Sequence, residues 1–178
     1  MQPTAQLGLL APLAFVATLA LPSAASAQYR LPTLRSVARA DSLHQAADIM
    51  ATTTYRWRDA ASLHRQSAAL RAADDSLGYR CLTLAAHLSF ASNDLSSAQG
   101  DMSSAAEQAL ARGDVAQAAH AYANAAWVAK ERDNEGQVYT LGRKAEVLAS
   151  SPLLSPAQRV GILQRFTHAD RAYAGATR

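Results

Sequence analysis

The stretch that decides the fold is ARGDVAQAAHAYANAAWVAKE, residues 111–131, in which small and apolar residues recur at helical spacing. They fall at i, i+3, i+4 and i+7, the positions that share one face of an α-helix. The pattern predicts an amphipathic helix from Val115 to about Glu131. Its apolar face consists of Val115, Ala118, Ala119, Tyr122, Ala125, Ala126 and Ala129.

The tripeptide Arg112-Gly113-Asp114 precedes this helix and has two interpretations, an adhesion signal on a loop or a turn between two helices. Gly113 readily adopts the positive φ that ends many helices. Asp114 is a good N-cap for the next helix, with Gln117 as its capping-box partner. Arg112 places a cation in the last turn of the preceding helix, where the helix dipole favours it. These features favour the turn.

The remainder of the chain from residue 31 onward also has helical spacing and few β-branched residues. The polar stretch 92–101 is expected to be a loop or a weak helix start, and residues 52–57 are expected to break the first helix. Short turns make neighbouring helices antiparallel, so the predicted fold is all-α, with about seven helices in stacked antiparallel hairpins. The predicted helices are 33–51, 58–73, 76–92, one ending near 111, 115–131, 135–149 and one opening with the capping-box sequence Ser155-Pro156-Ala157-Gln158.

Two segments resemble the tetratricopeptide repeat. GDVAQAAHAYANA (113–125) is similar to that family's turn and second helix, with Gly113 and Asp114 in the turn and Ala118, Tyr122 and Ala125 at helix contacts. VYTLGRKA (138–145) resembles a first helix, with Leu141-Gly142 at the family's leucine-glycine pair. The resemblance implies a right-handed superhelix, with the best repeat at 98–131 and a second, partial repeat at 135–170.

The same resemblance implies a groove, lined by the first helices of the repeats, in which a partner binds. The side chains expected in this groove come from two helices: Ser103, Glu107, Tyr139, Arg143 and Glu146. Tyr139 would stack on a partner, and Arg143 would bind a carboxylate in a bidentate pair. The alternative is an ordinary exposed helix face. Trp127 lies just outside the apolar face of its helix, and is expected to cover a neighbouring helix or to mark a contact surface.

The segment 1–27 has the pattern of a bacterial signal peptide. An uncharged apolar run (7–21) is followed by Ala25-Ser26-Ala27, which predicts cleavage before Gln28 and a periplasmic or secreted protein with a single helical-repeat domain at 28–178. No Lys or Arg precedes residue 7, so either the true start lies upstream or the N-terminal amine serves alone. An uncleaved helix that anchors the chain in the inner membrane is the alternative to cleavage. The run is shorter than the roughly 20 residues of a membrane-spanning helix, which favours cleavage and no stable membrane span.

No motif for catalysis, a cofactor or a metal is recognisable. His44, His64, His87, His120 and His168 lack the spacing that lets two imidazoles share a zinc ion on one helix, which leaves open only a metal site assembled across helices, for which no residue pattern argues. His64 and Cys81 fall on apolar faces and are expected in the core. The predicted buried face around Cys81 comprises Leu77, Cys81, Leu84, Leu88 and Ala91.

The single cysteine excludes an internal disulfide, and the net charge of +3 is not clustered, which argues against nucleic acid as a partner. The sequence therefore favours an exported scaffold that binds a protein or peptide, with no catalysis, cofactor or metal. A small-molecule or lipid carrier with an apolar cavity in a helical bundle is the alternative. An enzyme without a recognisable motif, using a pocket around His64 or His87, is the third hypothesis.

Overall fold

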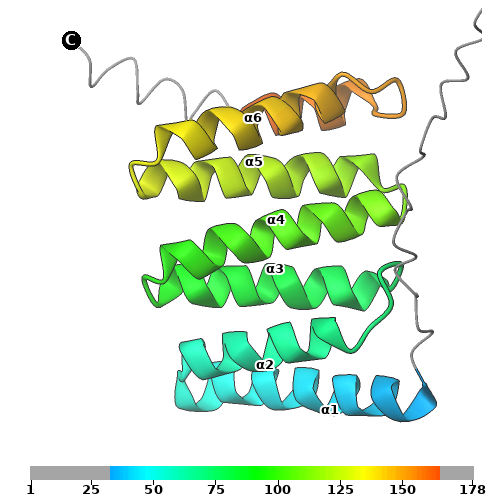
Figure 1. Ribbon diagram of the computed structural model, residues 1–178, viewed down its shortest axis with the longest axis vertical. Helices are drawn as coiled ribbons and strands as arrows, with labels where there is room; N and C mark the ends of the chain where they lie inside the picture. The colour runs from blue at the N-terminus through cyan, green and yellow to red at the C-terminus, as the bar shows by residue number, and fades with distance from the viewer. Residues whose placement is uncertain (1–32, 165–178) are drawn as a thin grey trace, which may run out of the picture.

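The computed structural model describes residues 33–164, which form helices and turns and contain no strand (Figure 1). This confirms the predicted all-α fold of antiparallel helical hairpins. The signal peptide predicted at 1–27 and the end of the partial repeat predicted at 135–170 lie outside the described residues. The helices are α1 (Leu34–Ile49), the π-helical turn η1 (Met50–Thr54), α2 (Trp57–Ala69), α3 (Ser76–Ala91), α4 (Leu95–Ala111), α5 (Val115–Glu131) and α6 (Glu135–Ala149), and residues 156–164 are also helical.

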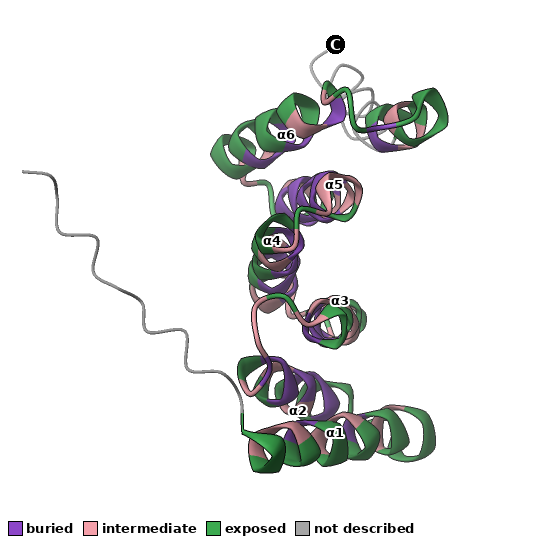
Figure 2. Ribbon diagram, turned by 90° about the vertical axis from the view of Figure 1, so that its right-hand side faces the viewer, coloured by how far each residue is buried: buried purple, intermediate pink, exposed green. Residues whose placement is uncertain are grey.

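The helices stack in chain order, and each packs against the next one along the chain. Seen from the side, α2, α4 and α6 lie along one edge of the stack, and α3 and α5 lie along the other (Figure 2). None of the described helices is long and apolar enough to cross a membrane. Because the helices stack in chain order, the first and the last helix each have one face that no further helix of the described part covers.

Three successive turns share one geometry and recur at equal intervals along the sequence. Asn93, Gly113 and Asp133 have φ of +60°, +74° and +53° and end α3, α4 and α5 in the left-handed conformation. The residue after each of them caps the next helix, because its side chain accepts a hydrogen bond from the backbone N–H three residues on; these caps are Asp94, Asp114 and Asn134. The repeated turn fixes the antiparallel order of α3 to α6.

Two features of these turns differ from the expectations. The side chain of Gln117 does not complete a capping box, because its Oε1 accepts a hydrogen bond from Arg112 (2.8 Å) and the N–H of Asp114 donates to the carbonyl of Ala109. The hairpin unit is also longer than expected, since α4 begins at Leu95 and α6 begins at Glu135. A tetratricopeptide repeat spans roughly 34 residues. The unit here is longer because α4 and α5 each contain 17 residues.

Alanine makes up most of the core. Ala118 and Ala125 are fully buried in α5, and Gly142 is buried in α6, so neighbouring helices approach closely. Tyr122 and Leu141, each 4% exposed, are among the few large side chains that fill the space between α5 and its neighbours. Trp127 contacts the ring of Phe90 in α3 (centroids 4.8 Å apart), so it covers a neighbouring helix as one of its two predicted roles requires.

The predicted buried face of residues 76–92 is largely wrong. Leu77 is 38% exposed, and Leu84 and Leu88 are only half-buried. The buried residues of α3 are instead Gly78, Cys81, Leu82, Ala85, Ala86 and Ser89. Most of these residues are small, and a Cβ at Gly78 would require the flexible end of the Gln108 side chain, whose Oε1 would lie 2.9 Å away, to move aside.

The structure also fixes two helix boundaries. Residues 95–101 are the first two turns of α4, so the helix start, one of the two expectations for 92–101, is confirmed, because Asp94 caps the helix and Ala98 is fully buried. Residues 52–57 break the first helix as expected, because Tyr55 has φ of +54° and ends it there. Before this break, α1 continues into η1, whose threonine hydroxyls donate to carbonyls four residues earlier.

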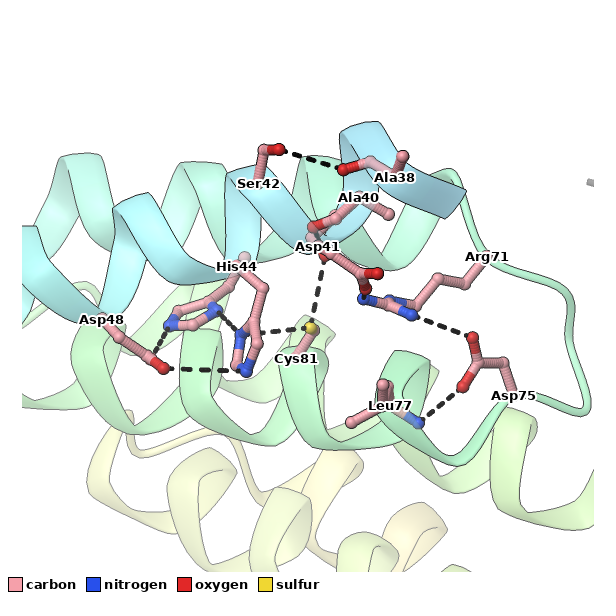
Figure 3. A network of polar contacts seen from close by, with 12 residues as sticks. Ala38, Ala40, Asp41, Ser42, His44, Asp48, Arg71, Asp75, Leu77 and Cys81 are labelled. Carbon is pink, nitrogen blue, oxygen red and sulfur yellow. Dashed lines mark hydrogen bonds and ion pairs between the residues drawn. The ribbon is translucent and has the colours of Figure 1, made fainter. Parts of the chain in front are cut away.

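Polar side chains join both neighbouring helices and helices two places apart along the chain. Arg65 in α2 pairs with the buried Asp101 in α4, and Gln99 in α4 contacts Gln137 in α6. The buried guanidinium of Arg71, at the end of α2, pairs with Asp41 in α1 and Asp75 at the start of α3 (Figure 3). The two pairs of Arg71 therefore join α1, α2 and the start of α3.

Candidate functional site

The side chains predicted to bind a partner lie on α4 and α6. Tyr139 is 75% exposed, and Arg143 and Glu146 form an exposed ion pair (2.6 Å) on the same face of α6. The pKa of Arg143 is raised, because its guanidinium donates to Glu146. In α4, Glu107 is exposed, but Ser103 is half-buried and its hydroxyl donates to the carbonyl of Gln99 in the same helix. The structure therefore groups the three residues of α6.

A surface depression of about 400 Å³ lies beside the turn that joins α4 to α5. It is lined by the Arg112-Gly113-Asp114 turn and by the segment that follows α6, including Leu153 and Gln158. The depression is open to solvent and lined largely by polar atoms. It is therefore not the enclosed apolar cavity expected of a lipid carrier.

A second group of chemically active side chains lies in the first three helices. His44 is on α1, His64 on α2 and Cys81 on α3, and each points into the space between these helices. His64 is 1% exposed and Cys81 is fully buried, as their sequence neighbours predict, whereas the side chain of His44 is 18% exposed. Potential metal-ligating atoms of the three residues all lie within 4.8 Å of one another.

The two imidazole rings face each other through their Nδ1 atoms. Nδ1 of His44 lies 3.3 Å from Nδ1 of His64 and 3.7 Å from Sγ of Cys81. The rings are tilted by 53° and their centroids are 5.2 Å apart, so they meet through these nitrogens rather than by stacking. Figure 3 shows Cys81 on one side of His44 and Asp48 on the other.

Asp48 lies one helical turn after His44 and approaches the outer nitrogen of both rings. Its Oδ2 is 3.6 Å from Nε2 of His44, and its Oδ1 is 3.4 Å from Nε2 of His64. A carboxylate in this position favours the proton on Nε2 of each ring, which leaves both Nδ1 atoms as acceptors. The cluster formed by His44, His64, Cys81 and Asp48 is called the histidine–cysteine cluster below.

Burial decides the protonation of His64. It lowers the pKa of this imidazole to about 4, against the opposing attraction of Asp48, and the nearby charges of His44 and Arg80 lower it further. His64 is therefore a neutral imidazole near pH 7, the form that binds metal ions. The thiol of Cys81 donates to the buried hydroxyl of Ser67 (3.5 Å), which itself donates to the carbonyl of Ala40.

Sequence reasoning missed this cluster because its ligands come from three helices and form no local motif. The spacing rule that argued against zinc applies to two histidines on one helix, whereas His44 and His64 lie on different helices. One local signal was present: Asp48 follows His44 by four residues, the spacing at which a carboxylate reaches an imidazole on the same helix face.

The chain matches no protein-family model, and no curated protein and no solved structure is detectably similar to it. The likeness to the tetratricopeptide repeat thus rests on the residues of the turn, the helix contacts and the leucine-glycine pair. The class that the fold itself defines is an all-α protein of stacked helical hairpins.

Proposed function

We propose that this chain is an exported bacterial helical-repeat protein that binds a protein or peptide partner in the cell envelope and does no chemistry on it. The observation that supports this best is the exposed ring of Tyr139 beside the Arg143–Glu146 pair, on a helix whose other face is buried. Exposed aromatic and arginine side chains are the residue types most enriched in the centres of protein interfaces.

The α6 face suits a partner segment that carries both an aromatic or apolar side chain and a carboxylate. Tyr139 offers the stacking surface, and Arg143 can bind the carboxylate in two parallel hydrogen bonds. Arg143 would exchange Glu146 for the partner at little cost, because solvent screens an exposed ion pair and leaves it only weakly stabilising.

A small-molecule or lipid carrier is the second candidate function. The depression beside Gly113 would be its binding site, and the open, polar character of that depression suits a small polar ligand better than a lipid. This function predicts that ligand binding depends on Arg112 and Gln158 and is unaffected by changes on α6.

A photo-crosslinking amino acid at position 139 tests the proposed interface, and the same amino acid at Gln117, an exposed position on α5, is the control. We expect a defined adduct in envelope fractions from position 139 only, lost when Arg143 is also changed to Ala. Equal adducts from both positions, or adducts unchanged by Arg143→Ala, would contradict the α6 interface.

Affinity capture adds a second readout that compares the wild type with a Tyr139→Ala/Arg143→Ala variant. The matched control is Arg39→Ala/Gln45→Ala, which alters two exposed residues of α1. The proposal expects only the α6 variant to lose its partner. Mass spectrometry of the chain recovered from the envelope tests export separately, with an N-terminus at Gln28 as the expected result.

A further inference from the structure

We propose that His44, His64 and Cys81 bind a divalent transition-metal ion of the zinc class between α1, α2 and α3. This inference is independent of the proposed interface on α6. It rests on three ligand atoms of the types that Zn²⁺ prefers, imidazole nitrogen and thiolate sulfur, brought together from three helices.

Two of the measured separations match the edges of a tetrahedral zinc site. Zn–N bonds of about 2.0–2.1 Å and a Zn–S bond of about 2.3 Å at tetrahedral angles place two nitrogens about 3.3 Å apart and a nitrogen and a sulfur about 3.6 Å apart. The observed Nδ1–Nδ1 separation of His44 and His64 is 3.3 Å, and the Nδ1–Sγ separation of His44 and Cys81 is 3.7 Å. The third separation, between His64 and Cys81, is within 4.8 Å, so binding an ion requires these two side chains to lie about 3.6 Å apart, as a tetrahedral site does.

The position of Asp48 argues against a simple hydrogen bond between the two imidazoles when both rings are neutral. Such a bond needs a proton on Nδ1 of one ring, and a neutral ring with that proton presents a bare Nε2 to the carboxylate of Asp48. Two acceptors would then face each other at the 3.4 or 3.6 Å that separates Asp48 from His64 and His44. With both protons on Nε2, the two Nδ1 lone pairs face each other instead, and a cation between them removes this repulsion.

The charges of the cluster select a divalent ion over a monovalent one. A thiolate at the buried Cys81 and the half-exposed carboxylate of Asp48 carry two negative charges, which a divalent ion neutralises. A Cu⁺ ion would leave one negative charge there. Three protein ligands also leave the fourth position of a tetrahedral zinc ion for a water molecule.

The histidine–cysteine cluster has the outer contacts that metal sites in proteins use. Asp48 is placed to hold both imidazoles through their outer nitrogens. His44 is partly exposed, and Asp48 is half exposed, so an ion can enter from the solvent side of α1. The site would join three helices through one ion.

Binding of Co²⁺ and Zn²⁺ to the purified chain tests the proposal. We expect one equivalent of Co²⁺ to give the visible absorption of a tetrahedral ion together with a sulfur-to-cobalt charge-transfer band, and Zn²⁺ to displace it. Competition with a chromogenic zinc chelator gives the affinity. Wild-type protein that shows no sulfur-to-cobalt band overturns the proposal, and so does a chain that binds Cu⁺ but no Zn²⁺.

Two ligand variants and one matched control decide which residues hold the ion. Cys81→Ser should abolish the charge-transfer band. His44→Gln should weaken Zn²⁺ binding at least about 100-fold, the upper end of the loss that removal of an outer partner causes. His87→Gln, an exposed histidine on α3, should leave both unchanged.

If the wild type, Cys81→Ser and His44→Gln bind zinc with equal affinity, other histidines bind the ion and the proposed site is wrong. Far-UV circular dichroism shows whether each variant folds. If Cys81→Ser does not fold, the partly exposed His44 provides the decisive variant, together with the cobalt spectrum of the wild type.

Discussion

Arg65 in α2 and Asp101 in α4 form a partly buried ion pair in which Nε of the arginine lies 2.9 and 3.0 Å from the two carboxylate oxygens. The same guanidinium donates to the hydroxyl of Ser89 in α3 at 2.6 Å. One side chain therefore joins three consecutive helices across a core that is otherwise built mostly from alanine. Burial raises the pKa of Asp101 despite the attraction of Arg65, so desolvation offsets much of the stabilisation that the pair provides.

Replacing Asp101 with Ala should destabilise the fold by about 2 kcal/mol, because it leaves the guanidinium of Arg65 without its charged partner. Asp59 is a matched control, since its ion pair with Arg56 is exposed and contributes about 1 kcal/mol or less. Urea unfolding followed by circular dichroism measures both variants. Equal losses in Asp101→Ala and Asp59→Ala would show that the buried pair has no special role.

Two glycine substitutions should act in opposite directions. Gly113 has φ of +74°, so Gly113→Ala is strained even though the space around its Cβ is open, and it should cost about 1 kcal/mol. Gly100 lies within α4, and a Cβ there also meets no atom within 4 Å. Gly100→Ala should therefore stabilise the helix by about 0.5–1 kcal/mol. A melting temperature that shifts in the same direction for both variants contradicts this account of the turn.

The N-cap of α4 gives a prediction for pH. Hydrogen bonds from the side chain and backbone of Ser97 lower the pKa of Asp94 below its usual 3.8. A carboxyl whose pKa is lower in the folded state adds stability that is complete above the unfolded pKa and disappears as the pH falls through the folded one. Asp94→Ala should therefore cost about 1 kcal/mol at pH 7 and less at about pH 3. A difference between wild type and variant that does not change with pH would show that the charge of Asp94 contributes nothing.

The sequence predicts a helix accurately when the signals lie within that helix, and it fails when the decisive contact comes from another helix. The bounds of α5 and α6 agree with the prediction because a cap residue, Asp114 or Asn134, precedes an apolar pattern in each. The start of α4 stayed open between a loop and a weak helix start because residues 92–101 are polar, and only the distant partner of Asp101, Arg65 in α2, explains its burial. The same reason hid the histidine–cysteine cluster, since contacts between helices do not follow from spacing within one helix.

Asp48→Asn should weaken Zn²⁺ binding by about 10- to 100-fold, the usual effect of losing an outer partner of a metal-bound histidine. An amide has one acceptor oxygen, so the new side chain can accept from Nε2–H of only one ring, and its NH₂ group faces the other. Asp133→Asn is the control, because Asp133 lies exposed in the turn between α5 and α6. Zinc competition titrations measure the affinities, and thermal unfolding in excess chelator measures the stability of the metal-free chains. The site requires a loss of affinity in Asp48→Asn alone; an equal affinity in both variants would mean that Asp48 does not orient the ligands.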